Sequence, residues 1–106
     1  MSELQKLQFR FAVLTAMLLQ EIIGRGYQFT WGDAFRDPRA TFPYSHKASL
    51  HNCRLAIDLQ IFRNGVWLRK GEDFEDLGIY WESIGGSWGG RFDDGGHFSL
   101  AYNGMR

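Results

Sequence analysis

Hydrophobic residues in the first quarter of the chain recur at the three- and four-residue steps of an amphipathic helix. The pattern covers residues 3–24 and consists of Leu4, Leu7, Phe11, Leu14, Leu18 and Ile22. Gly24 and Gly26 follow as a stop signal, so a helix is predicted over this range. The next segment, residues 27–31, alternates aromatic with polar residues and is predicted to be a strand.

Residues 32–48 show neither period and are predicted to be a loop. The loop contains prolines and several charged or titratable residues: Arg36, Pro38, Arg39, Pro43, His46 and Lys47. A loop of this length in a compact domain is more often functional than idle.

Beyond the loop, apolar residues alternate with others from Leu55 to Ile61, which predicts a strand with one core face. Asn64 and Gly65 then form a strong hairpin signal, with a return through residues 66–68. The second half of the chain therefore begins with two paired strands.

A shorter amphipathic helix is predicted over residues 72–84, followed by a glycine-rich loop over residues 85–96 and a final strand over residues 97–102. Together these elements predict an α+β fold. We expect a small, mainly antiparallel sheet with the N-terminal helix packed on one face and the candidate site on the other.

Strand parity places two polar residues on a shared face. Asp58 and His97 each lie opposite the apolar residues of their strands, so neighbouring antiparallel strands would present both on the non-core face. His51 has the opposite parity to Asp58. It can join them only if the chain bends between Asn52 and Arg54.

The composition places few restrictions on function. The 106 residues form a single domain, residues 1–106, with room for one core. Twelve basic residues balance 12 acidic ones, so nothing favours nucleic acid or an anionic membrane as a partner. The single cysteine, Cys53, excludes an internal disulfide.

The N-terminus does not have the features of a signal peptide. Residues 1–8 lack a basic start and a small-residue cleavage site, and the apolar stretch over residues 11–19 is too short to span a bilayer. We expect a protein made in the cytoplasm, which needs another factor to reach a substrate outside.

Two histidines and an aspartate form a common zinc ligand set that leaves one tetrahedral position open for water. Asp94 lies three residues before His97 and adds a carboxylate that could move protons on and off that water. The spacing between His51 and Asp58 is weak evidence when taken alone.

The surrounding motifs are more specific. The stretch Ser49-Leu50-His51-Asn52-Cys53-Arg54-Leu55-Ala56-Ile57-Asp58 resembles the Ser-x-His-x-x-Gly-x-Ala-x-Asp signature of the VanY-type zinc peptidases. That family includes D-alanyl-D-alanine carboxypeptidases and the L-alanyl-D-glutamate peptidases used as bacteriophage endolysins. Trp88-Gly89-Gly90 and Asp94-Gly95-Gly96-His97-Phe98 are similar to elements of the phage endolysin branch. Upstream, residues 26–38 resemble the strand and Tyr-Arg-Ser-Pro turn of the family.

This resemblance implies a role for each matching residue. It implies three zinc ligands, which are His51, Asp58 and His97. Asp94 matches the catalytic acid/base, which activates water and then protonates the leaving amine. Arg36 would hold a substrate carboxylate or carbonyl. Ser49 would bind substrate or steady the loop that carries His51.

Several alternatives stay open. Asp93 could replace Asp94 if the loop register differs. Arg36 could simply pair with Asp33 or Asp37, with Arg39 as the rival substrate binder. Ser49 could cap a turn.

Two residues near His51, Cys53 and Arg54, raise further questions about the site. Arg54 stands where the family signature has glycine, so the bend is not expected to use a glycine conformation; its side chain could instead point at substrate. Cys53 could close the site as a fourth ligand, but we expect a small buried residue.

The expected function is a zinc peptidase that cleaves the peptidoglycan stem peptide, at the L-alanyl-D-glutamate bond, as a phage lysis enzyme. One alternative is a D-alanyl-D-alanine carboxypeptidase or dipeptidase with the same metal site. Another is a non-catalytic zinc domain that binds cell-wall peptide. We expect a monomer whose partner is the stem peptide.

Overall fold

The computed structural model describes residues 1–37, 39 and 49–106, so the predicted loop is described only in part and His46 lies outside it. The helices are α1 (Glu3–Gly24) and α2 (Glu75–Ser83), with short 3-10 helices η1 (Leu50–Cys53), η2 (Gly71–Phe74) and η3 (Gly89–Phe92). The strands are β1 (Gln28–Trp31), β2 (Ala56–Arg63), β3 (Val66–Trp67), β4 (Ser87–Trp88) and β5 (His97–Ser99).

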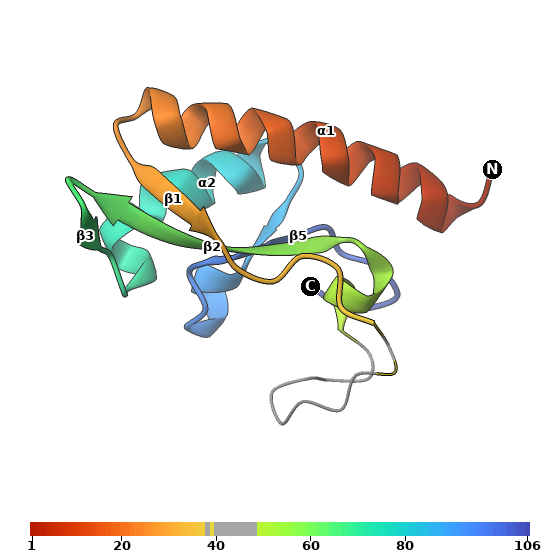
Figure 1. Cartoon of the computed structure of the whole chain (residues 1–106). Coiled ribbons are helices and arrows are strands. Elements are labelled where there is room, and N and C mark those ends of the chain that lie inside the picture. The colour runs from red at the N-terminus through yellow and green to blue at the C-terminus, as the bar shows by residue number, and fades with distance from the viewer. Residues whose placement is uncertain (38, 40–48) are drawn as a thin grey trace.

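Every strand pairing is antiparallel, in the order β1-β2-β5-β4, and β3 pairs with β2 through the hairpin. The central strand β2 lies beneath α1 in Figure 1. At the hairpin, Asn64 and Gly65 both have positive φ, 51° and 77°. This is the backbone that a two-residue type I′ turn requires.

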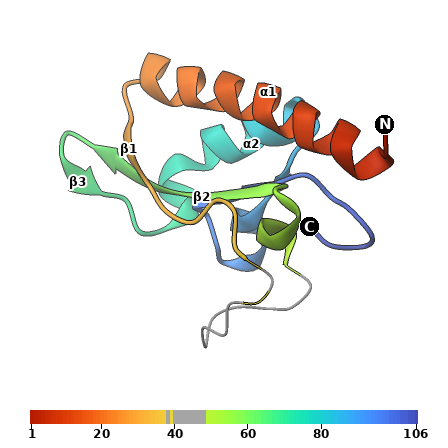
Figure 2. The ribbon, with the colours of Figure 1, turned by 45° about the vertical axis from the view of Figure 1, so that its right-hand side comes forward.

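The core fills one face of this sheet. Both helices contribute to it, and Figure 2 shows α2 alongside α1. The indole of Trp81 on α2 is fully buried and meets Phe11 of α1 and Phe98 of β5 edge to face, each with ring centroids 6.0 Å apart. The Trp81 ring nitrogen donates to the Ser87 and Ser99 carbonyl oxygens, so α2 is tied to β4 and β5.

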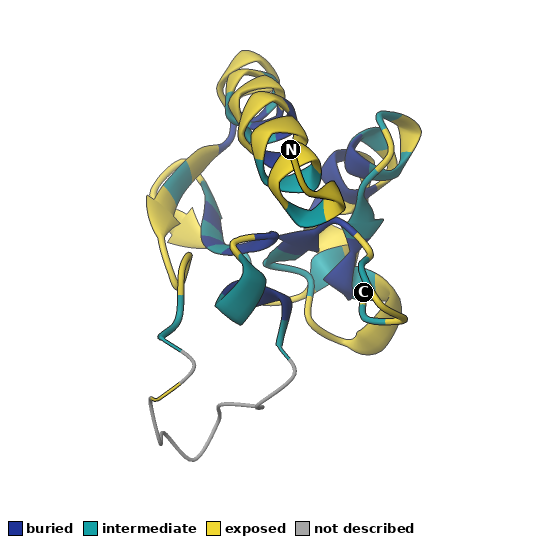
Figure 3. Cartoon of the chain, turned by 90° about the vertical axis from the view of Figure 1, so that its right-hand side faces the viewer, coloured by how far each residue is buried: buried dark blue, intermediate teal, exposed yellow. Residues whose placement is uncertain are grey.

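Helix α1 is buried along one side only, as the exposed outer surface in Figure 3 shows. Its buried residues are Phe11, Leu14, Leu18 and Ile22. By length and composition alone the helix could cross a membrane. Core helices and N-terminal signal sequences pass the same test, so this is weak evidence, and the prediction from residues 11–19 alone understated the apolar length.

The predicted elements are largely confirmed. The first helix has the predicted bounds, and the α+β class with an N-terminal helix over a small antiparallel sheet is correct. The glycine-rich segment is not only a loop, because it contains β4 and η3. The last strand ends at Ser99, three residues earlier than predicted.

Candidate metal centre and active site

Strands β2 and β5 place the first two candidate ligands. Asp58 and His97 are direct partners in the antiparallel register, so both side chains lie on the face away from the core. The backbones of β2 and of the residue before β5 approach closely beside this pair, because the Leu59 amide donates to the Gly96 carbonyl oxygen at 2.8 Å. A Cβ atom at Gly96 would lie 2.5 Å from the Leu59 carbonyl oxygen, so this contact requires glycine.

The third candidate ligand, His51, comes from the 3-10 helix η1. The Ser49 hydroxyl caps this helix by accepting from the His51 amide at 3.1 Å. Arg54 then ends it in the left-handed conformation, with φ 61° and ψ 34°. The predicted bend between Asn52 and Arg54 is therefore present.

The expectation that this bend would avoid a glycine conformation was wrong. Arg54 adopts that conformation itself, at a cost of about 1 kcal/mol for a residue with a Cβ atom. Its guanidinium lies 4.4 Å from the centre of the Phe35 ring, a cation–π contact that helps to hold the bend.

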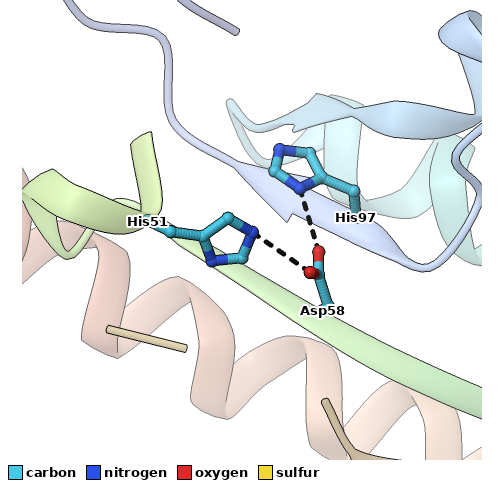
Figure 4. Close-up of side chains that lie close together, drawn as sticks. All are labelled: His51, Asp58 and His97. Atoms are coloured by element: carbon cyan, nitrogen blue, oxygen red, sulfur yellow. Dashed lines mark hydrogen bonds and ion pairs between the residues drawn. The ribbon is translucent and has the colours of Figure 1, made fainter. Parts of the chain in front are cut away.

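The bend brings the three side chains together (Figure 4). One ligand atom from each of His51, Asp58 and His97 lies within 4.8 Å of the others, so the group could hold a metal ion. Asp58 sits between the rings, with its Oδ2 3.1 Å from His51 Nε2 and its Oδ1 3.0 Å from His97 Nδ1.

The far side of the His51 ring is fixed by the backbone. His51 Nδ1 lies 2.8 Å from the Ala34 carbonyl oxygen, which accepts its proton and leaves Nε2 facing Asp58. Such a partner fixes the tautomer and the ring plane of a metal-binding histidine. The donor set and its orientation therefore fit a divalent metal.

The segment after β1 continues along the site. The Asp58 amide donates to the Asp33 carbonyl oxygen at 2.7 Å, and the Asp58 carbonyl oxygen accepts from the Gly32 amide at 2.8 Å. The Arg36 amide donates to the His51 carbonyl oxygen at 3.2 Å. Backbone hydrogen bonds thus join two of the three candidate ligands to one loop.

The charges of the group are strongly coupled. Burial alone would raise the pKa of Asp58, but the hydrogen bonds from His51 and His97 outweigh it and lower that pKa to about 2. Burial likewise opposes protonation of His51, but the Asp58 carboxylate and the Ala34 carbonyl raise its pKa above the usual value. Asp58 is thus an anion across the physiological range.

A fourth titratable group, Asp94, faces the same space. A cavity of about 300 Å³ is lined by Asp33, Arg36, Ser49, His51, Asp58, Asp94 and His97. Partial burial raises the pKa of Asp94, and the nearby Asp58 carboxylate raises it further. A carboxyl group with a raised pKa beside a metal site suits proton transfer.

The loop that carries Asp94 is held in place by the side chain of Trp88. The Trp88 ring nitrogen donates to the Gly95 carbonyl oxygen at 2.8 Å, and Trp88 itself is 3% exposed, so it packs beneath the site. A Cβ atom at Gly89 would collide with the Asp94 carbonyl oxygen. Asp93 has positive φ and lines a neighbouring groove instead of this cavity.

Of the remaining candidate residues, Arg36 lines the cavity, whereas Arg39 and Cys53 lie outside it. Arg36 lines it and pairs with Asp33 at 2.9 Å, with its side chain only 10% exposed. Arg39 is 90% exposed and pairs with Asp37, and it is absent from the lining. Cys53 packs against the core, outside the group that could hold a metal.

A metal-binding group with an open side and an adjacent carboxyl group defines a candidate metallohydrolase site. The sequence profile of the D-alanyl-D-alanine carboxypeptidases matches residues 44–100, more than half of the chain, including the three candidate ligands and Asp94. The chain belongs to this family and is a peptidase that acts on cell-wall peptides. No match was found among curated proteins.

The sequence did not reveal the backbone acceptors that orient the site. The carbonyl oxygens of Asp33 and Ala34 contact the amide of Asp58 and the ring of His51. A carbonyl oxygen leaves no trace in residue identity, so only the fold could show these contacts. The Asp33–Arg36 pair is one of the alternatives that the sequence left open for Arg36.

Proposed function

We propose that this protein is a zinc peptidase that cleaves the peptidoglycan stem peptide at the L-alanyl-D-glutamate bond, as a phage endolysin. Residues 1–106 would form one peptidase domain. One observation carries the peptidase mechanism, namely that Asp94 lines the cavity onto which His51, Asp58 and His97 converge. The choice of bond rests on the likeness of the segments at Trp88–Gly90 and Asp94–Phe98 to the endolysin branch.

His51, Asp58 and His97 would hold the zinc ion. Two imidazoles and a carboxylate match its preferences, and three protein ligands leave a position for substrate or water. When bound, the ion supplies Lewis-acid chemistry by polarising the scissile carbonyl and acidifying a water molecule.

Asp94 would act as the acid/base. Its carboxylate accepts a proton from the attacking water molecule and then passes that proton to the leaving amine nitrogen. The raised pKa of Asp94 makes both directions of transfer easier near neutral pH.

Arg36 would bind a carboxylate or carbonyl of the substrate. Asp33 holds its guanidinium at the cavity wall, so little side-chain freedom is lost on binding. Ser49 caps the helix that carries His51, and its place in the cavity lining leaves it within reach of substrate.

The same proposal includes the cellular setting. The protein would be made in the host cytoplasm as a monomer, and a holin-like pore or the virion would bring it to the wall. Its partner would be the stem peptide, and its balanced charge of 12 basic and 12 acidic residues gives no reason to expect nucleic acid.

Bound zinc and wall lysis, measured for three variants, test the mechanism. His97→Ala should lose both metal and lysis, because a ligand is removed. Asp94→Ala should keep the metal and lose lysis. Asp37→Ala is the matched control, since this carboxylate pairs with Arg39 outside the cavity, and it should behave like the native protein. Normal lysis by Asp94→Ala would show that the mechanism is wrong.

Mass spectrometry of digested peptidoglycan tests the bond. A new N-terminal D-glutamate supports the endopeptidase, whereas free D-alanine would favour the alternative, a D-alanyl-D-alanine carboxypeptidase or dipeptidase. A non-catalytic wall-peptide binder would release neither product, and the presence of Asp94 beside the candidate ligands argues against it.

A further inference from the structure

The cavity at the metal centre continues into a groove along the open face of the sheet. Asp58 and Asp94 line both the cavity and this groove, which has a volume of about 220 Å³. The groove passes Gln60 and reaches Trp67 and Arg69 beyond the hairpin. A ligand at the metal centre could therefore extend toward these two side chains.

Strand register explains why these residues share a face. Asp58, Gln60 and Phe62 alternate along β2, and Trp67 of β3 is the direct partner of Phe62. Four residues of strand separate Asp58 from Phe62, a distance of about 13 Å. An extended peptide covers about 3.3–3.6 Å per residue, so the groove accommodates two to four substrate residues.

Arg69 differs from the arginines that the structure pairs with acids. Its guanidinium lies 4.8 Å from the centre of the Trp67 ring, and Trp67 is 47% exposed. Among the described residues, no carboxylate forms an ion pair with Arg69, whereas Arg36 is paired with Asp33. Arg69 thus carries a charge, held on an aromatic ring, that faces a groove.

We propose that Arg69, held against Trp67, binds a carboxylate of the peptide substrate two to four residues from the bond that is cleaved. A planar guanidinium binds a carboxylate through two parallel hydrogen bonds, and the ring limits its rotation beforehand. This inference rests on the proposed function for the position of the cleaved bond, but the binding itself does not require cleavage.

The charges around Arg69 show that its selectivity for a carboxylate would come from the geometry of the guanidinium and not from a local excess of positive charge. The groove is lined by the carboxylates of Asp58, Asp93 and Asp94 as well as by Arg69, and the adjoining cavity adds Lys70 and Glu72. Acidic groups therefore outnumber basic ones, and the surface does not attract anions in general. A carboxylate at the distance and angle of the Arg69 fork would be selected over other anions.

Three synthetic peptides test the inference. The first is L-alanyl-γ-D-glutamyl-L-lysyl-D-alanine, the second carries a carboxamide at its C-terminus, and the third carries a carboxamide at the α-carboxyl of glutamate. The terminal carboxylate belongs to the third residue after the cleaved bond and is the one expected to bind Arg69. The glutamate α-carboxyl belongs to the residue at that bond, so its amidation serves as a control. Dissociation constants are measured by calorimetry with a chelator present, and KM and kcat are measured in zinc.

Arg69→Gln should raise the Kd and KM of the first peptide about tenfold or more, as expected when a charged hydrogen bond is lost, with kcat unchanged. Amidation of the contacted carboxylate should have the same effect on the native protein and no further effect on Arg69→Gln. Arg69→Lys should recover part of the loss, because the charge stays and the fork does not.

Arg63→Gln is the matched control. Arg63 lies at the end of β2 and also stacks on an aromatic ring, 4.0 Å from the centre of Tyr27, but it does not line the groove. Binding of all three peptides should be unchanged in this variant.

Two results would overturn the inference. In one, Arg69→Gln binds and cleaves all three peptides like the native protein, which would leave the proposed function intact. In the other, Trp67→Ala weakens all three peptides equally while Arg69→Gln has no effect, which would assign the surface to an uncharged ring. Arg69-dependent binding without any hydrolysis would support the inference and contradict the proposed function.

Discussion

The two faces of β2 carry opposite chemistry on one backbone. Leu59 and Ile61 point into the core and are 2% and 1% exposed, while Asp58 and Gln60 point into the cavity and groove. Two helices cover the first face, whereas the second carries the candidate metal-binding group and the groove that continues from it. Stability and function are therefore separable between adjacent residues of a single strand.

The largest effect is expected on the core face. Leu59→Ala removes a nearly fully buried side chain and should lower the free energy of unfolding by about 2–5 kcal/mol. Gln60→Ala, one residue away on the groove face, should change it by less than about 0.5 kcal/mol. Urea denaturation measures both. Equal losses would mean that the two faces do not differ in their contribution to stability.

On the site face, we expect a substitution to affect metal binding more than stability. Asp58→Asn keeps the shape of the side chain but removes the anion that contacts both histidines. Zinc affinity should fall more than a hundredfold, beyond the tenfold to hundredfold typical of residues that only support a ligand. The metal-free protein should lose about 2 kcal/mol of unfolding free energy, because the contacts that lower the pKa of Asp58 also stabilise the folded state.

A metal competition assay measures the zinc affinity of Asp58→Asn. Asp37→Asn is the control, because Asp37 pairs with Arg39 away from the cavity. Native zinc affinity in Asp58→Asn would remove Asp58 from the ligand set.

The dependence on pH should change sign with the metal. In the metal-free protein the pKa of His51 is raised, so its contribution to stability is complete below about pH 6.5 and is lost as the pH rises through the folded value. With zinc present, stability should rise over the same range, because the ligand must be neutral. Asp58, with a pKa of about 2, contributes no slope there.

Thermal denaturation at pH 6, 7 and 8, with chelator or with excess zinc, measures the two slopes. The variant His51→Gln should remove the His51 contribution from both. Slopes of the same sign in the native protein would contradict the coupling of His51 to Asp58 and to the metal.

The smallest effect is expected at the bend that joins His51 to the strand. Arg54→Gly relieves a left-handed residue of about 1 kcal/mol but loses the contact with Phe35, so the net gain in unfolding free energy should be a few tenths of a kcal/mol. Arg54→Ala loses the contact without that relief and should be less stable than the native protein. Denaturant titration of the three proteins measures the order. If Arg54→Ala equals Arg54→Gly, the left-handed conformation is not maintained in solution.

Much of the fold could be predicted because periodicity is local. The helix over residues 3–24 was correct in both bounds, and the shared face of Asp58 and His97 followed from parity. Strand β4 and the helix η3 were missed, because their pattern is hidden among glycines that allow close backbone packing. The parity of a strand depends only on residues that are neighbours in the sequence. The conformation of β4 and η3 depends on the packing of Trp88 and on pairing with strand β5.

The sequence by itself determined the helix, the hairpin, the core face of β2 and the motifs that resemble the zinc peptidases. Each of these depends on residues close together in the chain or on residue identity alone. Only the tertiary structure decided that Arg54 turns left-handed, that the Ala34 carbonyl orients His51, and that Arg69 faces the groove that starts at Asp58. Those facts depend on which distant backbone atoms and side chains come within reach, and local pattern does not encode such distances.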